Sequence, residues 1–104
     1  MDETTSINWI DAETGNHDGG VAYGPGFCVS WQRGPTTEGG GERNGAYLLD
    51  VLEVCKTQLT HYQSGQFACD ENVKALAYLQ ETICALEERL ERRQAEGKLG
   101  THEA

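Results

Sequence analysis

The chain has 104 residues, of which 17 are acidic and 8 are basic, giving a formal net charge of −9 at pH 7. This length suits one small domain with a modest core. An acidic field repels nucleic-acid polymers, whose binding requires many cationic contacts to phosphate, so general DNA or RNA binding is excluded. A small anion can still bind where a few cations gather.

The first half of the chain has the pattern of strands and turns. In "GFCVSWQRG", Phe27, Val29 and Trp31 alternate with smaller or polar residues, and "INWI" is expected to add a second short strand. The stretches "DAETGNHDGG" and "GPTTEGGGERNG" are predicted to be turn-rich connections, the second of them mobile because three consecutive glycines hold no fixed shape. We therefore expect a small N-terminal antiparallel sheet within residues 1–45.

The second half has helical periodicity. A first helix is predicted from about residue 46 to 63, ended near Gly65, and a second from Asp70, as its N-cap, to about residue 96, ended by Gly97. The apolar stripe of the first comprises Leu48, Leu52, Cys55, Leu59 and Tyr62, and that of the second Leu76, Leu79, Ile83, Leu86 and Leu90. Spacing near 3.5 lets two antiparallel helices share one seam.

These elements predict an α+β fold, a small sheet followed by a helical hairpin and C-terminal tail in residues 46–104, the whole forming one compact domain. A two-helix hairpin covers only one side of its apolar surface. We therefore expect a second copy of the chain to cover more of it, and hence a homo-oligomer.

The four cysteines are widely spaced and form no C-x-x-C pair. The N-terminus "MDETTSINWI" has no basic region followed by an apolar run, so reduced thiols in a cytoplasmic protein are expected. No segment approaches the roughly 20 apolar residues that cross a bilayer, so no membrane partner is expected. The spacing between the cysteines and His17, His61 or His102 does not match that of a zinc site. The sequence also contains no phosphate-loop motif and no cofactor signature.

The apolar rhythm of the second predicted helix ends on arginine. Arg93 occupies the position that would continue the stripe, and Arg89 lies one turn earlier on the same face. Two guanidinium groups side by side suit phosphate oxygens, because each presents rigid paired donors. Alternatively, both pair with Glu88, Glu91 or Glu96 and keep the helix soluble.

Two further side chains are candidates for ligand contact. Tyr62 ends the first stripe, where its ring either completes the core or stacks on a base. Asn72, in the first turn of the second helix, either caps that helix or hydrogen-bonds a ligand. His61 has no nucleophile placed with it by any spacing, so no enzyme is indicated.

Three segments resemble the Thoeris anti-defence family of phage proteins: "RNGAYLLDVLEVC", "HYQSGQFACDENVKALAYLQETICALEERLERR" and "GKLGTH". The resemblance covers about Gly24 to His102, and its most specific parts are "F-x-C-x-E-N" and the Arg-x-x-x-Arg pair. It implies a small β-domain plus a helical hairpin, with pockets between the subunits of a dimer or larger assembly.

The resemblance also implies a non-enzymatic sponge. Proteins of this family are understood to bind cyclic ADP-ribose isomers made by bacterial TIR-domain defence proteins, and to hold this signal uncleaved so that the effector stays silent. Some relatives capture cyclic dinucleotides or trinucleotides. The expected partners are thus a small cyclic nucleotide and further copies of the chain, in the cytoplasm of the infected host. An enzyme that degrades the signal and a protein-binding hairpin are the alternatives.

The resemblance assigns ligand-binding roles to five residues. Arg89 and Arg93 match the arginines that contact the ligand's phosphates, Tyr62 matches the aromatic residue that stacks on adenine, and Asn72 matches the asparagine of the "E-N" element. Arg43, just before the shared "N-G", is a further expected contact, although the loop preceding it varies in length.

The chain departs from the family's pattern at two places. Relatives usually carry a basic residue where this chain has Asp70, and a "V-E-G" run where it reads "KLG". A negative charge near the start of the second predicted helix leaves the preferred ligand open.

Overall fold

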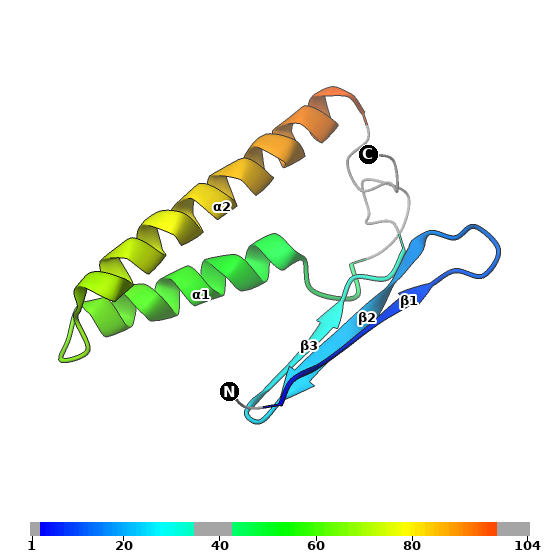
Figure 1. Cartoon of the computed structure of the whole chain (residues 1–104). Coiled ribbons are helices and arrows are strands. Elements are labelled where there is room, and N and C mark those ends of the chain that lie inside the picture. Colours follow the sequence, from blue (N-terminus) through cyan, green and yellow to red (C-terminus); the bar gives the residue numbers. More distant parts are fainter. Residues whose placement is uncertain (1–2, 35–42, 98–104) are drawn as a thin grey trace. The chain divides into compact units, whose positions relative to one another are not determined.

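The structure is a computed structural model that describes residues 3–34 and 43–97. Three strands precede two helices, and the strands form one antiparallel sheet (Figure 1), which confirms the expected α+β class. The chain divides into a sheet unit, Met1–Tyr47 with Arg93–Ala104, and a helix unit, Leu48–Arg92. The expected single compact domain stays a prediction. The predicted mobility of "GPTTEGGGERNG" and the "KLG" departure fall largely on positions outside the described residues.

The sheet is a meander of β1 (Thr5–Ile10), β2 (His17–Gly24) and β3 (Phe27–Trp31), with β2 in the centre. Each strand pairs antiparallel with the next along the chain, and β2 exchanges ladder hydrogen bonds with both neighbours. Strand alternation thus identified β1 and β3 correctly, with slightly different ends.

The central strand was not predicted. The expectation of a turn over "DAETGNHDGG" is wrong for its last four residues, because β2 already begins at His17. Gly20, with a φ of 149°, lies inside β2 beside the register shift between Asn8 and Ile10. A Cβ at Gly20 would collide with the carbonyl oxygen of Ile7, so this glycine serves the close approach of two strands, not a turn.

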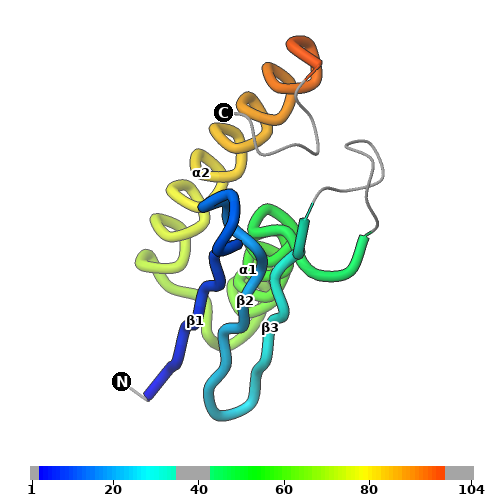
Figure 2. Tube along the Cα trace, turned by 90° about the vertical axis from the view of Figure 1, so that its right-hand side faces the viewer, coloured from blue at the N-terminus to red at the C-terminus, as the bar shows by residue number. Residues whose placement is uncertain are grey.

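The helices are α1 (Leu48–Gln63) and α2 (Asp70–Ala95), close to the predicted ranges. The helix unit contains both, except for the last three residues of α2. The helices run in opposite directions from their connecting turn and diverge away from it (Figures 1 and 2). Gly97, with a φ of 73°, follows the end of α2 as predicted, whereas Gly65 has no positive φ and supplies no left-handed cap to α1. Neither described helix is long and apolar enough to span a membrane.

The N-cap of α2 is Cys69, one residue before the predicted Asp70. The backbone N–H of Val73 donates to the carbonyl oxygen of Cys69 at 3.3 Å, which makes Asp70 the first helical residue. The Cys69 N–H in turn donates to Oε1 of Gln63 at 3.0 Å, which ties the start of α2 to the end of α1. The Asp70 carboxylate lies in the first turn of α2, where its negative charge interacts favourably with the positive end of the helix dipole.

The seam between the helices is shorter than predicted. Ile83, 1% exposed, is the buried hydrophobic side chain of the described residues. On the two predicted stripes, Leu48 and Leu90 are 54% and 41% exposed. The middle of the seam is half-buried at Leu52, Leu59, Leu76, Leu79 and Leu86. Because the helices are antiparallel, Leu48 and Leu90 both lie at the end away from the connecting turn. A single copy of the chain therefore leaves that end of its apolar stripe open to water.

Candidate ligand-binding site

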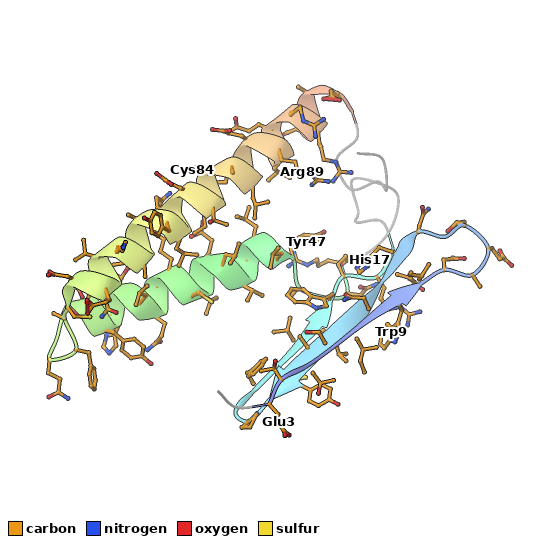
Figure 3. The ribbon with its side chains drawn as sticks, in the orientation of Figure 1. Glu3, Trp9, His17, Tyr47, Cys84 and Arg89 are labelled. Atoms are coloured by element: carbon orange, nitrogen blue, oxygen red, sulfur yellow. The ribbon has the colours of Figure 1, made fainter. Side chains whose placement is uncertain are left out.

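Arg89 and Arg93, the arginine pair, lie on the last two turns of α2. Figure 3 labels Arg89. Their spacing of four residues places both on one helix face. Arg89 is exposed and, within the described residues, makes no salt bridge, so pairing with Glu88 or Glu91 does not neutralise it. Arg93 is half-buried, with its Nε shielded from solvent.

Tyr62, Phe67 and Asn72 form a second group, the turn cluster, where the two helices join. The rings of Tyr62 and Phe67 meet edge to face, with centroids 6.0 Å apart and planes at 81°. Asn72 donates from Nδ2 to the carbonyl oxygen of Phe67 at 2.9 Å. This bond joins the first turn of α2 to the connecting turn, but it is not a helix cap, because a capping side chain accepts from a backbone N–H. The ligand-binding role of Asn72 stays a prediction.

The rings of the turn cluster face solvent. Tyr62 is 43% and Phe67 62% exposed, so Tyr62 does not complete a core within the helix unit. The ring of His61 lies 6.1 Å from that of Tyr62 and extends the aromatic surface. Phe67 was not assigned a ligand role from the sequence, although it opens the "F-x-C-x-E-N" element. Exposed aromatic faces of this kind offer stacking area to a planar ring.

The arginine pair and the turn cluster do not meet within one chain. Asn72 and Arg89 are 17 residues apart on the continuous helix α2, which at 1.5 Å per residue separates them by about 26 Å. This distance exceeds the combined reach of an arginine side chain and a compact nucleotide. One chain thus carries two separate clusters of different chemistry, one cationic and one aromatic, which we call the candidate half-sites.

Arg43, the fifth predicted contact, belongs to the sheet unit. Its Nε donates to the carbonyl oxygen of Gly45 at 2.6 Å, and its guanidinium carbon lies 3.9 Å from the ring centroid of Tyr47. Sequence reasoning did not single out Tyr47, although an aromatic residue four positions after Arg43 was a visible signal. A guanidinium that stacks on a ring keeps its charge and adopts a defined plane.

Arg33 has a different environment. Its Nη2 pairs with Oδ2 of Asp18 at 3.1 Å, and its guanidinium lies over the ring of Trp9 at 5.3 Å from the centroid. A carboxylate partner already satisfies part of this cation. The four cysteines are all exposed and unpaired, and no group of three potential metal ligands occurs in residues 3–34 and 43–97.

The fold and these clusters define a small α+β protein with cationic and aromatic half-sites on one helical hairpin. No family model matches the chain. Over 75 residues it is 37% identical to Thoeris anti-defense 1 of Bacillus phage SBSphiJ7, an alignment that covers 72% of this chain and 51% of that protein. The chain belongs to the Thoeris anti-defence family of phage proteins, and it spans about half the length of this relative.

Proposed function

We propose that this protein counters a Thoeris defence by binding and sequestering its small cyclic nucleotide signal, a cyclic ADP-ribose isomer, without cleaving it. Family membership supports the anti-defence role. The arginine pair is the observation that carries the binding role. An exposed guanidinium, which has no carboxylate partner within the described part of the chain, lies one turn from a half-buried one, in a chain of net charge −9. Such an arrangement favours a small anion over a polymer.

Each group in the two half-sites has a matching group on the ligand. Arg89 and Arg93 bind the oxygens of the pyrophosphate, since guanidinium forks suit phosphate geometry. Tyr62 stacks on the adenine ring, and Asn72 hydrogen-bonds a polar edge of the ligand. Arg43 supplies a further cation to the phosphates. Stacking combined with charge-assisted hydrogen bonds is sufficient for nanomolar affinity, about −12 kcal/mol.

The pocket requires two copies of the chain. Because the half-sites of one chain lie too far apart for one ligand, the arginine pair of one copy combines with the turn cluster of another. Two chains related by a two-fold axis, with their α2 helices antiparallel, form two identical pockets. The exposed apolar residues of the helices support this assembly, since Val54, Val73 and Tyr78 are 68%, 55% and 59% exposed in one copy.

Sequestration needs tight binding and slow release and no chemical step. Because the protein acts by lowering the free concentration of the signal, the dissociation rate governs how long the effector stays silent. An enzyme that degrades the signal is the alternative that a product assay separates. Heating the incubated mixture and analysing the released nucleotide by mass spectrometry is expected to return the intact cycle, whereas a linear product would identify an enzyme.

A second candidate function, a hairpin that binds another protein, draws support from the same exposed apolar residues. The two candidates differ in their response to small ligands. A protein-interaction module would show no thermal shift with any cyclic nucleotide. A sponge gains stability in proportion to the logarithm of ligand concentration above its dissociation constant.

Calorimetry with a panel of cyclic ADP-ribose isomers and cyclic oligonucleotides tests the proposal directly. Arg89→Ala and Arg93→Ala should each weaken binding by about 10- to 100-fold, since a hydrogen bond to a charged group contributes roughly 1.5–3 kcal/mol. Arg92→Ala is the matched control, because it removes the same charge from a position about 100° around the helix from Arg93. Equal losses in all three variants would indicate a nonspecific effect of charge and contradict the assigned pocket.

A further inference from the structure

The segment that follows Arg43 is held against the end of β3 by backbone hydrogen bonds. The Ala46 N–H donates to the carbonyl oxygen of Ser30 at 2.7 Å, and the Gln32 N–H donates to the carbonyl oxygen of Ala46 at 3.1 Å. These bonds form an isolated parallel bridge between Ala46 and Trp31. The chain thus passes Arg43 and then aligns with the sheet before α1 begins.

Two side-chain amides close the same junction from both sides. Oε1 of Gln32 accepts from the backbone N–H of Asn44 at 2.9 Å and from that of Gly45 at 3.1 Å. The Asn44 side chain bonds to the backbone of Arg33 in return. Its Oδ1 accepts from the Arg33 N–H at 2.8 Å, and its Nδ2 donates to the Arg33 carbonyl oxygen at 3.0 Å. We call this set of bonds, from residues 32 and 33 to residues 44 and 45, the amide clamp.

Gly45 allows the clamp to close. A Cβ at this position would lie 2.6 Å from the carbonyl carbon of Trp31 and 2.7 Å from the backbone nitrogen of Gln32. Both atoms belong to the backbone of β3 or the residue after it, and they cannot move aside as a flexible side chain does. The absence of a side chain therefore lets the two backbones approach closely.

The clamp determines where the side chain of Arg43 lies. The carbonyl oxygen that accepts from Arg43 Nε belongs to Gly45, which the clamp holds, and the ring beneath the guanidinium belongs to Tyr47, one residue beyond the bridge. An arginine side chain loses rotamer entropy when it is immobilised, and a side chain already held before binding loses less of it on binding.

We propose that Gln32 and Tyr47 are positioning residues that hold Arg43 ready for a phosphate group of the ligand. This inference rests on the proposed function and assigns a role to two residues that do not themselves contact the ligand. Gln32 acts through the backbone of Asn44 and Gly45, while Tyr47 acts through its ring face. The affinity contributed by Arg43 depends on both.

Paired substitutions separate the positioning role from simple loss of structure. Gln32→Met keeps the length of the side chain and removes both the accepting Oε1 and the Nε2 group that donates to the carbonyl oxygen of Arg33. Tyr47→Leu removes the ring, whereas Tyr47→Phe keeps it. Two readouts apply to each variant: the exchange rate of the Arg43 Nε–H proton, measured by side-chain NMR of the free protein, and the dissociation constant of the cyclic ADP-ribose isomer.

Gln32→Met and Tyr47→Leu are expected to speed Arg43 Nε–H exchange and to weaken binding about tenfold, approaching the Kd of Arg43→Ala, as expected for loss of an oriented charged hydrogen bond. Tyr47→Phe should remain within about twofold of the unsubstituted chain, because the ring face persists. If Gln32→Met fails to fold, Tyr47→Leu still provides the test, since it leaves every bond of the clamp in place.

The outcomes distinguish this inference from the function on which it rests. Unchanged affinity in Gln32→Met and Tyr47→Leu, despite faster exchange at Arg43, would overturn the positioning role while the sponge stands. The positioning role would also be overturned, and the sponge would stand, if Arg43→Ala bound the ligand as tightly as the unsubstituted chain. Absence of nucleotide binding by the unsubstituted protein would overturn both.

Discussion

The chemistry available to each arginine of this protein depends on its immediate neighbours. Arg33 is paired with Asp18 and covered by Trp9, whereas Arg89 has no salt bridge among the described residues and Arg43 is stacked on Tyr47. A cation with a carboxylate partner gains less from an incoming phosphate, because that interaction must replace one already made. By this measure, Arg89 is a better anion ligand than Arg33.

The ring of Tyr62 provides a test at the residue scale. Tyr62→Leu is expected to weaken binding of an adenine-containing cyclic nucleotide by roughly 10- to 100-fold, because a stacked base contributes about 1–3 kcal/mol. Tyr62→Phe keeps the ring and should bind within about threefold of the unsubstituted chain, since stacking area is unchanged. Calorimetry with one ligand measures all three proteins.

Tyr23→Leu serves as the matched control for this ring. Tyr23 lies on β2 and is 44% exposed, almost the same as Tyr62. Its replacement should leave affinity unchanged. If loss of either tyrosine weakened binding equally, stacking at the turn cluster would be the wrong explanation.

At the scale of elements, local hydrogen bonds determine where the helices lie, whereas long-range hydrogen bonds determine where the strands lie. Helix ranges follow local periodicity and end signals, since each helical hydrogen bond joins residues four apart. The strands and the amide clamp join residues that are far apart along the chain, such as Gln32 and Asn44. A close approach of this kind requires a small residue at one defined position, which is the role of Gly20 in the sheet and Gly45 at the clamp.

The packing of α2 predicts a strong contrast between two aliphatic positions. Ile83→Ala should lower the free energy of unfolding by about 2–5 kcal/mol, the usual cost of truncating a fully buried side chain. Val54 is 68% exposed on α1. Val54→Ala should therefore lower the free energy of unfolding of a single copy of the chain by no more than about 0.5 kcal/mol. Chemical denaturation at low protein concentration gives both values.

The same pair of variants also reports on assembly. Oligomer stability depends on protein concentration. If Val54→Ala lowers the free energy of unfolding more at high than at low protein concentration, the Val54 side chain lies in a contact between copies. If Ile83→Ala lowers the free energy of unfolding no more than Val54→Ala does, the burial of Ile83 described for α2 is contradicted.

For the whole molecule, the central feature is the distance between its two half-sites. A chain with one cationic and one aromatic cluster at opposite ends of α2 cannot close a small pocket on its own. In the dimer that we propose, each chain gives its arginine pair to one pocket and its turn cluster to the other.

Mixing two inactive variants tests this arrangement. Neither the Tyr62→Leu chain nor the doubly substituted Arg89→Ala, Arg93→Ala chain should bind tightly alone. After unfolding and refolding together, the mixed dimers contain one intact pocket each, so about one quarter of all pockets should regain full affinity if the subunits pair statistically. Calorimetric stoichiometry measures this fraction. No recovery on mixing, with subunit exchange verified by native mass spectrometry, would show that the pocket is not shared between chains.

Several features could be predicted from the sequence because they depend on neighbours within a few positions. The α+β class, the extents of both helices and the end of α2 near Gly97 were confirmed. The placement of Arg89 and Arg93 on one face also follows from helical spacing alone. The roles assigned to Arg89, Arg93, Tyr62, Asn72 and Arg43 stay predictions, since they concern a ligand and a second copy of the chain.

Other features were decided only by tertiary structure, because they depend on which distant residues meet. Local pattern assigned Gly20 to a turn and the N-cap to Asp70, whereas strand pairing and the turn bonds place Gly20 in β2 and the cap at Cys69. The amide clamp and the ring under Arg43 had no local signature strong enough to reveal them. Periodicity determined which side chains share a helix face, and long-range contacts determined which of them are held, exposed or paired.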